Sequence, residues 1–280
     1  MVGPEAKKES ANYLRGAYKI SERWAFEIVD LNRSSGRYKS RRKSDAALID
    51  RITALALERR RFGYRRIFCL LRREGHLVNK KKVFRLYRAA GLSVRRRKGR
   101  KKARGSRFER LAVTRPNQRW SLDFVFDQLA DGRKLKLMTV VDEFTRESLA
   151  IEVARSIKGN DVVRILTQII AKRGKSEQIQ SDNGSEYTSN AILGWVHQSG
   201  IEWRYIEPGK PVQNSHIESF NGKIRDECLN ENWFETLHEA RVLIEIWRKD
   251  YNELRPHGSL NGLSPAAFAK EVSKNFEKTA

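Results

Sequence analysis

Charge is distributed unevenly along this chain, and the unevenness separates it into two parts. Up to Ala112 the sequence has 34 lysines and arginines against 10 aspartates and glutamates, a net charge of +24, whereas the remaining residues have 23 against 24, a net charge of −1. A strongly positive segment attracts polyanions, and duplex DNA, with about one phosphate charge per 1.7 Å of axis, suits it best. RNA or an anionic membrane remains possible on charge alone.

Length, hydropathy and cysteine content narrow the class further. The 280 residues are enough for two or three folded units. They include no apolar run of transmembrane length, and the start, MVGPEAKKES, lacks the apolar segment of a signal peptide. We therefore expect a cytoplasmic, nucleoid-associated protein. Cys69 and Cys228 are the only cysteines, which excludes a disulfide framework and a cysteine-rich zinc site.

The first 94 residues have helical patterns. In residues 1–44 a helical stretch around 21–30 is followed by a break and a second short segment from Ser34, a possible helix-turn-helix. In residues 45–94 the segment SDAALIDRITALALER spaces its apolar residues as one helical face. A further helix, RRIFCLLRRE, should end at Gly75, and Asn79 should cap the next one.

The helix after Asn79 is the strongest candidate for contact with DNA. It should bury Val83, Phe84, Leu86 and Tyr87, and its cations should face outward: Lys80, Lys81, Lys82, Arg85 and Arg88. Two helices joined by a short turn resemble helix-turn-helix DNA readers. The alternative is a small three-helix bundle with a solvated basic face.

Residues 95–112 should form a flexible basic linker. Nine lysines and arginines lie within the thirteen residues from Arg95 to Arg107, with two glycines and no apolar period. Such a segment would track phosphates, and the residues proposed for this contact are Arg95, Arg96, Arg97 and Lys98.

From Asn117 the pattern changes to that of an α/β domain. WSLDFVFDQ, KLKLMTVVDEF and ESLAIEV are rich in β-branched and aromatic residues and predict an antiparallel meander. Helices and strands then alternate, which indicates an α/β sheet. Residues 113–230 form this predicted core, and 231–280 a helical extension packed on it, whose long helix begins with a capping box at Thr236 and Glu239.

Three acidic residues of this core are candidates for catalysis. Asp123 lies within the first strand, Asp182 follows a later strand and precedes an Asn-Gly turn, and Glu218 lies on a helix whose apolar positions face elsewhere. Each alone has a structural explanation, since a strand aspartate can pair with arginine and Asp-Asn-Gly is a common turn. Together they would repel one another unless cations such as Mg²⁺ were bound.

The motifs around these acids resemble a known family. WSLDF, SDNGSEYTS and PGKPVQNSHIESFNGKIRDECLN, with the closing residues YN, RPH, SL and LSP, resemble the integrase-like DDE transposases of bacterial insertion sequences. Within that family the match is to the second-frame product, OrfB, of the subgroup encoded in two overlapping reading frames. The basic N-terminal helices take the place of the zinc-binding module of retroviral integrases.

This resemblance implies a fold, a reaction and partners. The fold is a ribonuclease-H-like core, a mixed five-stranded sheet flanked by helices, preceded by the small all-α helix-turn-helix region. The triad carries over as Asp123, Asp182 and Glu218, holding two Mg²⁺ ions for which Mn²⁺ can substitute. Cleavage exposes a 3′-hydroxyl at the element's end, which is then joined to another strand. The expected partners are terminal inverted repeats, target DNA, the first-frame portion, and further copies of the chain on DNA.

Arg225 is a further candidate with two interpretations. It lies seven residues after Glu218, close to two helical turns, so both side chains share a face and Arg225 could hold a DNA phosphate. A structural ion pair is the alternative. Asn214 and His216 could contact DNA or shape the metal site, although helix capping accounts equally well for Asn214.

Competing functions remain open on the sequence. A catalytically inactive helix-turn-helix regulator would not need all three carboxylates. A metal-dependent nuclease that hydrolyses without joining has the same acids. Tyrosine and serine recombinases need a nucleophilic hydroxyl among arginines, so metal dependence separates their mechanism from this one.

Overall fold

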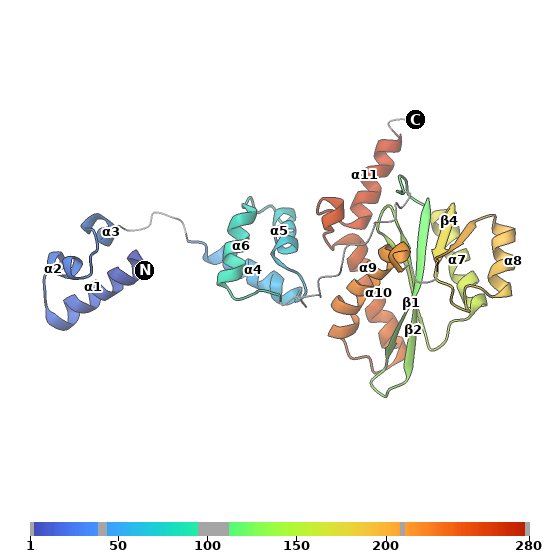
Figure 1. Cartoon of the computed structure of the whole chain (residues 1–280), viewed down its shortest axis with the longest axis horizontal. Coiled ribbons are helices and arrows are strands. Elements are labelled where there is room, and N and C mark those ends of the chain that lie inside the picture. Colours follow the sequence, from blue (N-terminus) through green and yellow to red (C-terminus); the bar gives the residue numbers. More distant parts are fainter. Residues whose placement is uncertain (1–2, 39–43, 95–111, 208–210, 278–280) are drawn as a thin grey trace. The chain divides into compact units, whose positions relative to one another are not determined.

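The N-terminal unit is a small helical bundle. The computed structural model describes residues 3–38, 44–94, 112–207 and 211–277 (Figure 1). The chain divides into two compact units, Met1–Leu48 and Ile49–Ala280. The first unit contains α1 (Pro4–Tyr18), α2 (Glu22–Ile28) and α3 (Arg33–Arg37). A Cβ on Gly36 would lie 2.4 Å from the Phe26 ring, so glycine lets α3 pack on α2. The sequence predicted the α2–α3 pair and missed α1.

The second unit begins with three helices at the predicted places. These are α4 (Ala46–Glu58), α5 (Tyr64–Arg73) and α6 (Lys80–Ala89). The Asn79 side chain accepts a hydrogen bond from the backbone N–H of Lys81, which confirms the predicted cap. One expectation was wrong: Phe84 is 40% exposed and lies outside the core, with its ring centroid 4.7 Å from that of Tyr64.

The rest of the second unit is built on a mixed five-stranded sheet with helices packed on it, which confirms the predicted α/β fold class. The strands are β1 (Arg119–Gln128), β2 (Lys134–Asp142), β3 (Ser148–Ala154), β4 (Gln178–Ser181) and β5 (Glu202–Tyr205). Their order is β3-β2-β1-β4-β5; β1, β2 and β3 are antiparallel, and β4 and β5 are parallel to β1. The ladder between β1 and β4 ends at Ser121, so the rest of β1 extends beyond β4.

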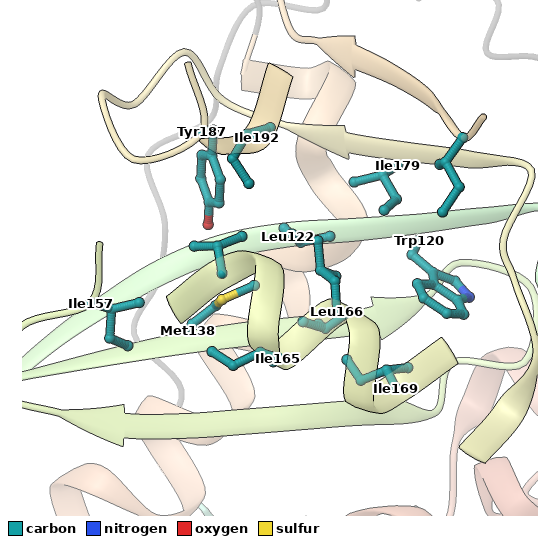
Figure 2. Close-up of a cluster of buried hydrophobic side chains, with 13 residues drawn as sticks. Trp120, Leu122, Met138, Ile157, Ile165, Leu166, Ile169, Ile179, Tyr187 and Ile192 are labelled. Carbon is teal, nitrogen blue, oxygen red and sulfur yellow. The ribbon is translucent and has the colours of Figure 1, made fainter. Parts of the chain in front are cut away.

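Helices cover both faces of the sheet (Figure 1). On one face, α7 (Gly159–Arg173) and α8 (Asn190–Ser199) pack against strand residues such as Leu122 and Met138 (Figure 2). On the other, α9 (Ser215–Glu227) and α10 (Leu237–Glu253) cover the alternate strand positions, and α11 (Pro265–Glu277) follows α10. Since strand side chains alternate between faces, the position after Leu122 points toward α9.

Arginines of α5 bond to α9 and to the segment after α10. Arg66 and Arg255 both reach the buried carboxylate of Glu227, at the end of α9, over 2.8 Å and 2.6 Å. Arg73 donates to the carbonyl of Gly262 over 2.9 Å. A Cβ on Gly262 would lie 2.9 Å from the Cys69 sulfur, so a glycine with φ +84° allows this close contact.

The long helix α10 begins at the predicted capping residue. The Thr236 hydroxyl accepts from the backbone N–H of Glu239. The Glu239 carboxylate accepts from the N–H of Glu235, one residue earlier than a standard capping box would have it. Among the described residues, no helix is both long and apolar enough to cross a membrane.

Candidate active site

Asp123 lies on β1 with its carboxylate turned toward α9, as the alternation of the strand predicted. One oxygen accepts the backbone N–H of Phe124 over 2.8 Å, and the other accepts the side-chain amide of Asn221 over 2.7 Å. Burial, and then the negative charges of Asp182 and Glu218, raise the pKa of Asp123 to about 6, although both hydrogen bonds act against the shift. Asp182 and Glu218 therefore both lie close enough to act on Asp123.

Asp182 directly follows β4, and the chain turns sharply behind it. Its carboxylate accepts the backbone N–H of Gly184 over 3.1 Å. Tyr187 ends this turn, fully buried and stacked on Phe124 with ring centroids 5.0 Å apart. Its hydroxyl has no hydrogen-bond partner among the described residues, and burial together with the charges of Asp123 and Asp182 raises its pKa well above the usual value.

Glu218 occupies the first turn of α9, where its side chain is exposed. Its apolar neighbours Ile217 and Phe220 are fully buried, and they fix the helix against the sheet. Glu218, Asn221 and Arg225 follow one another at helical spacing on the side of α9 that faces β1. Three separate elements, β1, β4 and α9, thus bring the three predicted acids to one place.

The donor set of this place fits a divalent cation. Carboxylate oxygens are the ligands that Mg²⁺ and Mn²⁺ prefer, and a cation would offset the burial and the repulsion that raise the pKa of Asp123. In the described part of the chain, no three acidic, histidine or cysteine side chains are already close enough to hold one ion together. Asp123 and Asp182 each accept a hydrogen bond from a nearby backbone N–H group.

Asn221 is a site residue that the sequence interpretation missed. Its amide nitrogen donates to Asp123, and its amide oxygen accepts the hydroxyl of the buried Thr139 over 2.9 Å. These two bonds fix the orientation of the amide and, through it, that of the carboxylate. The signal was available, because a residue three positions after Glu218 shares its helix face.

Asp123→Asn should stabilise the protein when no metal is bound. Because the pKa of Asp123 is about 6 in the folded state, above its ordinary value of 3.8, the folded protein binds this proton more tightly, and stability is lost as pH rises through about 6. In EDTA at pH 8 we expect the variant to have a higher melting temperature. The corresponding gain in the free energy of unfolding is about 1 kcal/mol, after discounting the pKa shift for partial exposure. At pH 4 the two proteins should melt together.

Asp127→Asn is the matched control for this measurement, because Asp127 lies on the same strand and also accepts the next N–H, that of Gln128. The melting temperature of Asp127→Asn should stay near that of the native protein at both pH values. A lower melting temperature for Asp123→Asn at pH 8 would contradict the repulsion inferred here.

Arg225 is exposed and donates to the backbone carbonyl of Phe126 over 2.6 Å. Phe126 belongs to the part of β1 beyond β4, so Arg225 occupies the open edge of that strand. Asn214 also bonds to the backbone of β1, because its side-chain amide donates to the carbonyl of Leu122. It makes no side-chain cap to α9, which disagrees with the capping interpretation.

The predicted DNA-contact cations are placed only in part. On α6 the side chains of Lys80, Lys81, Arg85 and Arg88 are exposed and that of Lys82 is half-buried. Arg95, Arg96, Arg97 and Lys98 lie outside the described residues. The exposed set forms a basic helix surface, as the sequence predicted.

Comparison with family models and solved structures agrees with this architecture. An HTH-like domain matches residues 43–100, and two models of an integrase core domain match residues 113–211 and 199–265. A cryo-electron-microscopy structure of the simian T-cell lymphotropic virus intasome in complex with PP2A regulatory subunit B56 gamma is 15% identical, with a TM-score of 0.51 over 78% of this chain and 74% of that one. The fold is therefore the ribonuclease-H-like integrase core, the class of nuclease and polynucleotidyl-transferase enzymes.

Relatives in sequence identify the family within this class. The 39.2 kDa protein of insertion element IS476 of Xanthomonas euvesicatoria is 47% identical over 96% of this chain and 78% of its own length. The 31.7 kDa protein of insertion element IS407 of Burkholderia multivorans is also 47% identical, over 91% and 93%. Transposase InsD for insertion element IS2D of Escherichia coli is 27% identical over 85% and 83%. The chain belongs to the integrase-core transposases of bacterial insertion sequences.

Proposed function

We propose that this transposase cuts DNA at the ends of its element and joins the exposed 3′-hydroxyl to another strand, using divalent metal held by Asp123, Asp182 and Glu218. The observation that carries the proposal is the position of Asp123, which is turned from β1 toward α9 and lies within electrostatic reach of Asp182 and Glu218. Burial, and then these two charges, raise its pKa. Acids from β1, β4 and α9 converge at a cost that only bound cations would offset. An inactive regulator would have no use for this arrangement.

Mg²⁺ is the proposed metal, as two ions for which Mn²⁺ substitutes. When bound, the pair would neutralise charge on the attacking and leaving oxygens of an in-line phosphoryl displacement, with water or a DNA hydroxyl as nucleophile. The protein's own residues hold and orient the carboxylates. Asn221 keeps one oxygen of Asp123 turned toward α9, and the Gly184 N–H holds Asp182 at the end of β4.

The DNA would lie along the basic surface of the second unit. We propose residues 45–94 as the DNA-binding domain, 95–112 as a basic linker, 113–230 as the catalytic core and 231–280 as its helical extension. A groove of about 730 Å³ beside α6 is lined by cations, including Arg65, Lys80 and Arg88, and none of its described lining residues is acidic. Arg225 lies at the edge of β1 and shares a helix face with Glu218. Its guanidinium would exchange the Phe126 carbonyl for a DNA phosphate when DNA binds.

A gel assay on labelled duplexes from the DNA that flanks the gene tests this function. Strand-transfer and cleavage products should form with Mg²⁺ or Mn²⁺ and not with EDTA, because the acids need the cation to act together. Products that form equally in EDTA would point to a hydroxyl nucleophile instead. Cleavage without any joined product would favour an ordinary nuclease, and binding without cleavage the regulator.

DNA binding should depend steeply on salt and lose part of that dependence when α6 loses charge. Each lost phosphate contact should lower the slope of log affinity against log salt by about 0.9. The double variant Lys80→Ala/Arg88→Ala should therefore lower this slope by about 2 and weaken binding to all DNA sequences alike. Fluorescence anisotropy measures both effects. Lys249→Ala, an exposed cation on α10, is the control. A slope that both variants leave unchanged would contradict the role of α6.

The first-frame portion is proposed as a partner, either as a fusion or as a separate chain, in an assembly of several copies on DNA at the nucleoid. We expect weak or poorly specific strand transfer from residues 1–280 alone, and a higher yield at the element's ends when the first-frame protein is added. The same gel assay, with end-containing and scrambled duplexes, measures both. Full specific activity from the chain alone would overturn this part of the proposal.

A further inference from the structure

Glu143 is a buried acid that the proposed metal site does not use. It follows the last residue of β2, and only 1% of its surface is exposed. The turn that follows β2 does not need its carboxylate, because the neighbouring Asp142 side chain accepts the N–H groups of Asn117, Phe144 and Thr145. Burying a charge is costly without compensating contacts, so the contacts of Glu143 indicate what it does.

The first contacts lead to β1, the strand of Asp123. The Ser121 hydroxyl donates to one oxygen of Glu143, and the Arg119 guanidinium lies 3.4 Å from the other. The backbone N–H of Glu143 also donates to the carbonyl of Arg119 over 3.0 Å. Ser121 is two residues before Asp123, so both side chains lie on the same face of the strand.

A second route leads to β4, the strand that ends at Asp182. Arg119 donates from Nε to the side chain of Gln178 over 2.6 Å, while its other nitrogen faces Glu143. Gln178 in turn donates to Glu202 on β5 over 2.7 Å. The three residues are paired in register across β1, β4 and β5, so the polar row begins at Glu143 and crosses the parallel part of the sheet.

The third route leads to α9, the helix of Glu218. His216, in the first turn of α9, has its Nε2 3.9 Å from a Glu143 oxygen. Arg146, from the same turn as Glu143, is bonded to the His216 ring. The residues before Glu218 are thereby held from the β2–β3 turn as well as from the sheet.

We propose that Glu143 is a positioning residue that sets the mutual placement of Asp123, Asp182 and Glu218 without touching the metal. Its contacts reach β1 and α9 directly, and β4 through Arg119. The proposal rests on the function proposed above, and it extends the site from three acids to four. Ser121, Arg119 and His216 transmit its effect to β1, β4 and α9.

The test separates placement from folding and from catalysis. Glu143→Gln keeps the size of the side chain and removes its charge, and Ser121→Ala removes one hydrogen bond to the carboxylate while leaving the charge in place. The matched control is Glu152→Gln, a half-buried acid on β3 that pairs with Arg164. Each full-length protein is assayed for thermal melting, for strand transfer against Mg²⁺ concentration, and for Tb³⁺ luminescence, a readout of the carboxylate site that needs no catalysis. Asp182→Asn supplies the background signal.

We expect Glu143→Gln to raise the half-saturating concentrations of Mg²⁺ and Tb³⁺ together by about tenfold, equal to about 1.4 kcal/mol. Ser121→Ala should shift both less and in the same direction, while the control shifts neither. A lower melting temperature with unchanged metal requirements in both variants would show a merely structural role. Lost activity with unchanged Tb³⁺ binding would also overturn the proposal. If no protein transfers strands, the Tb³⁺ series still tests placement by Glu143 while the proposed function fails.

Discussion

Glu218→Gln is expected to reduce strand transfer by about a thousandfold or more while leaving DNA binding unchanged. A lost metal ligand removes several kcal/mol of charge stabilisation in the transition state, and each 1.4 kcal/mol is tenfold in rate. The side chain is exposed on α9, between residues that are fully buried, so the substitution should not disturb folding. The measurement is the rate of product formation in Mg²⁺ beside anisotropy of the same labelled duplex.

Glu253→Gln is the matched control for this rate, because it makes the same change at an exposed position near the end of α10. It should transfer strands at the native rate. A Glu218→Gln protein that keeps more than about a tenth of the native rate would remove Glu218 from the metal site. Weaker DNA binding by the same variant would place its effect on binding instead.

The second large effect is on stability. Glu227→Ala is expected to lower the free energy of unfolding by about 3–5 kcal/mol, the usual loss when one partner of a buried ion pair is removed. Arg255 is 2% exposed, and its two bonds to Glu227 are both 2.6 Å long. Burial alone would raise the pKa of Glu227, but the hydrogen bonds and charges of Arg255 and Arg66 lower it overall. The contribution to stability is therefore present above the unfolded pKa and is lost as pH falls through the folded one.

Urea unfolding at pH 7 measures this loss. Glu245→Gln is the control, because Glu245 and Arg248 form a pair three residues apart on one helix that is only partly buried, and such pairs contribute less than about 1 kcal/mol. Replacing both Glu227 and Arg255 with apolar residues should recover much of the stability, since no charge is then left unpaired. Equal losses for the single and double variants would show that the pair is not what stabilises this region.

These two glutamates lie on one helix and have different tasks. Glu218, in the first turn of α9, lies within electrostatic reach of Asp123, and Glu227, in the last turn, is held by arginines from α5 and from the segment after α10. A change in how α5 contacts α9 would therefore act on the helix that carries Glu218. Some of the positive charge of the N-terminal half is thus used within the protein and is not available to DNA.

Local chemistry determined much of this protein from the sequence alone. Helix ends at Gly75, Asn79 and Thr236 follow from backbone preferences that act over three or four residues. The α/β core follows from side-chain periodicity, and the three candidate acids follow from their places at a strand, a strand end and a helix. The integrase-core family could be recognised because these motifs are short and contiguous.

Only the tertiary structure decided which distant groups meet. Asn221 orients Asp123, Arg225 bonds to a strand-edge carbonyl, and Glu143 reaches three elements. Phe84, expected in the core, lies beside Tyr64 at the surface instead. The physical reason is the same in each case: hydrogen bonds and ion pairs form between neighbours in space, and sequence periodicity specifies the direction of a side chain but not the partner across the fold.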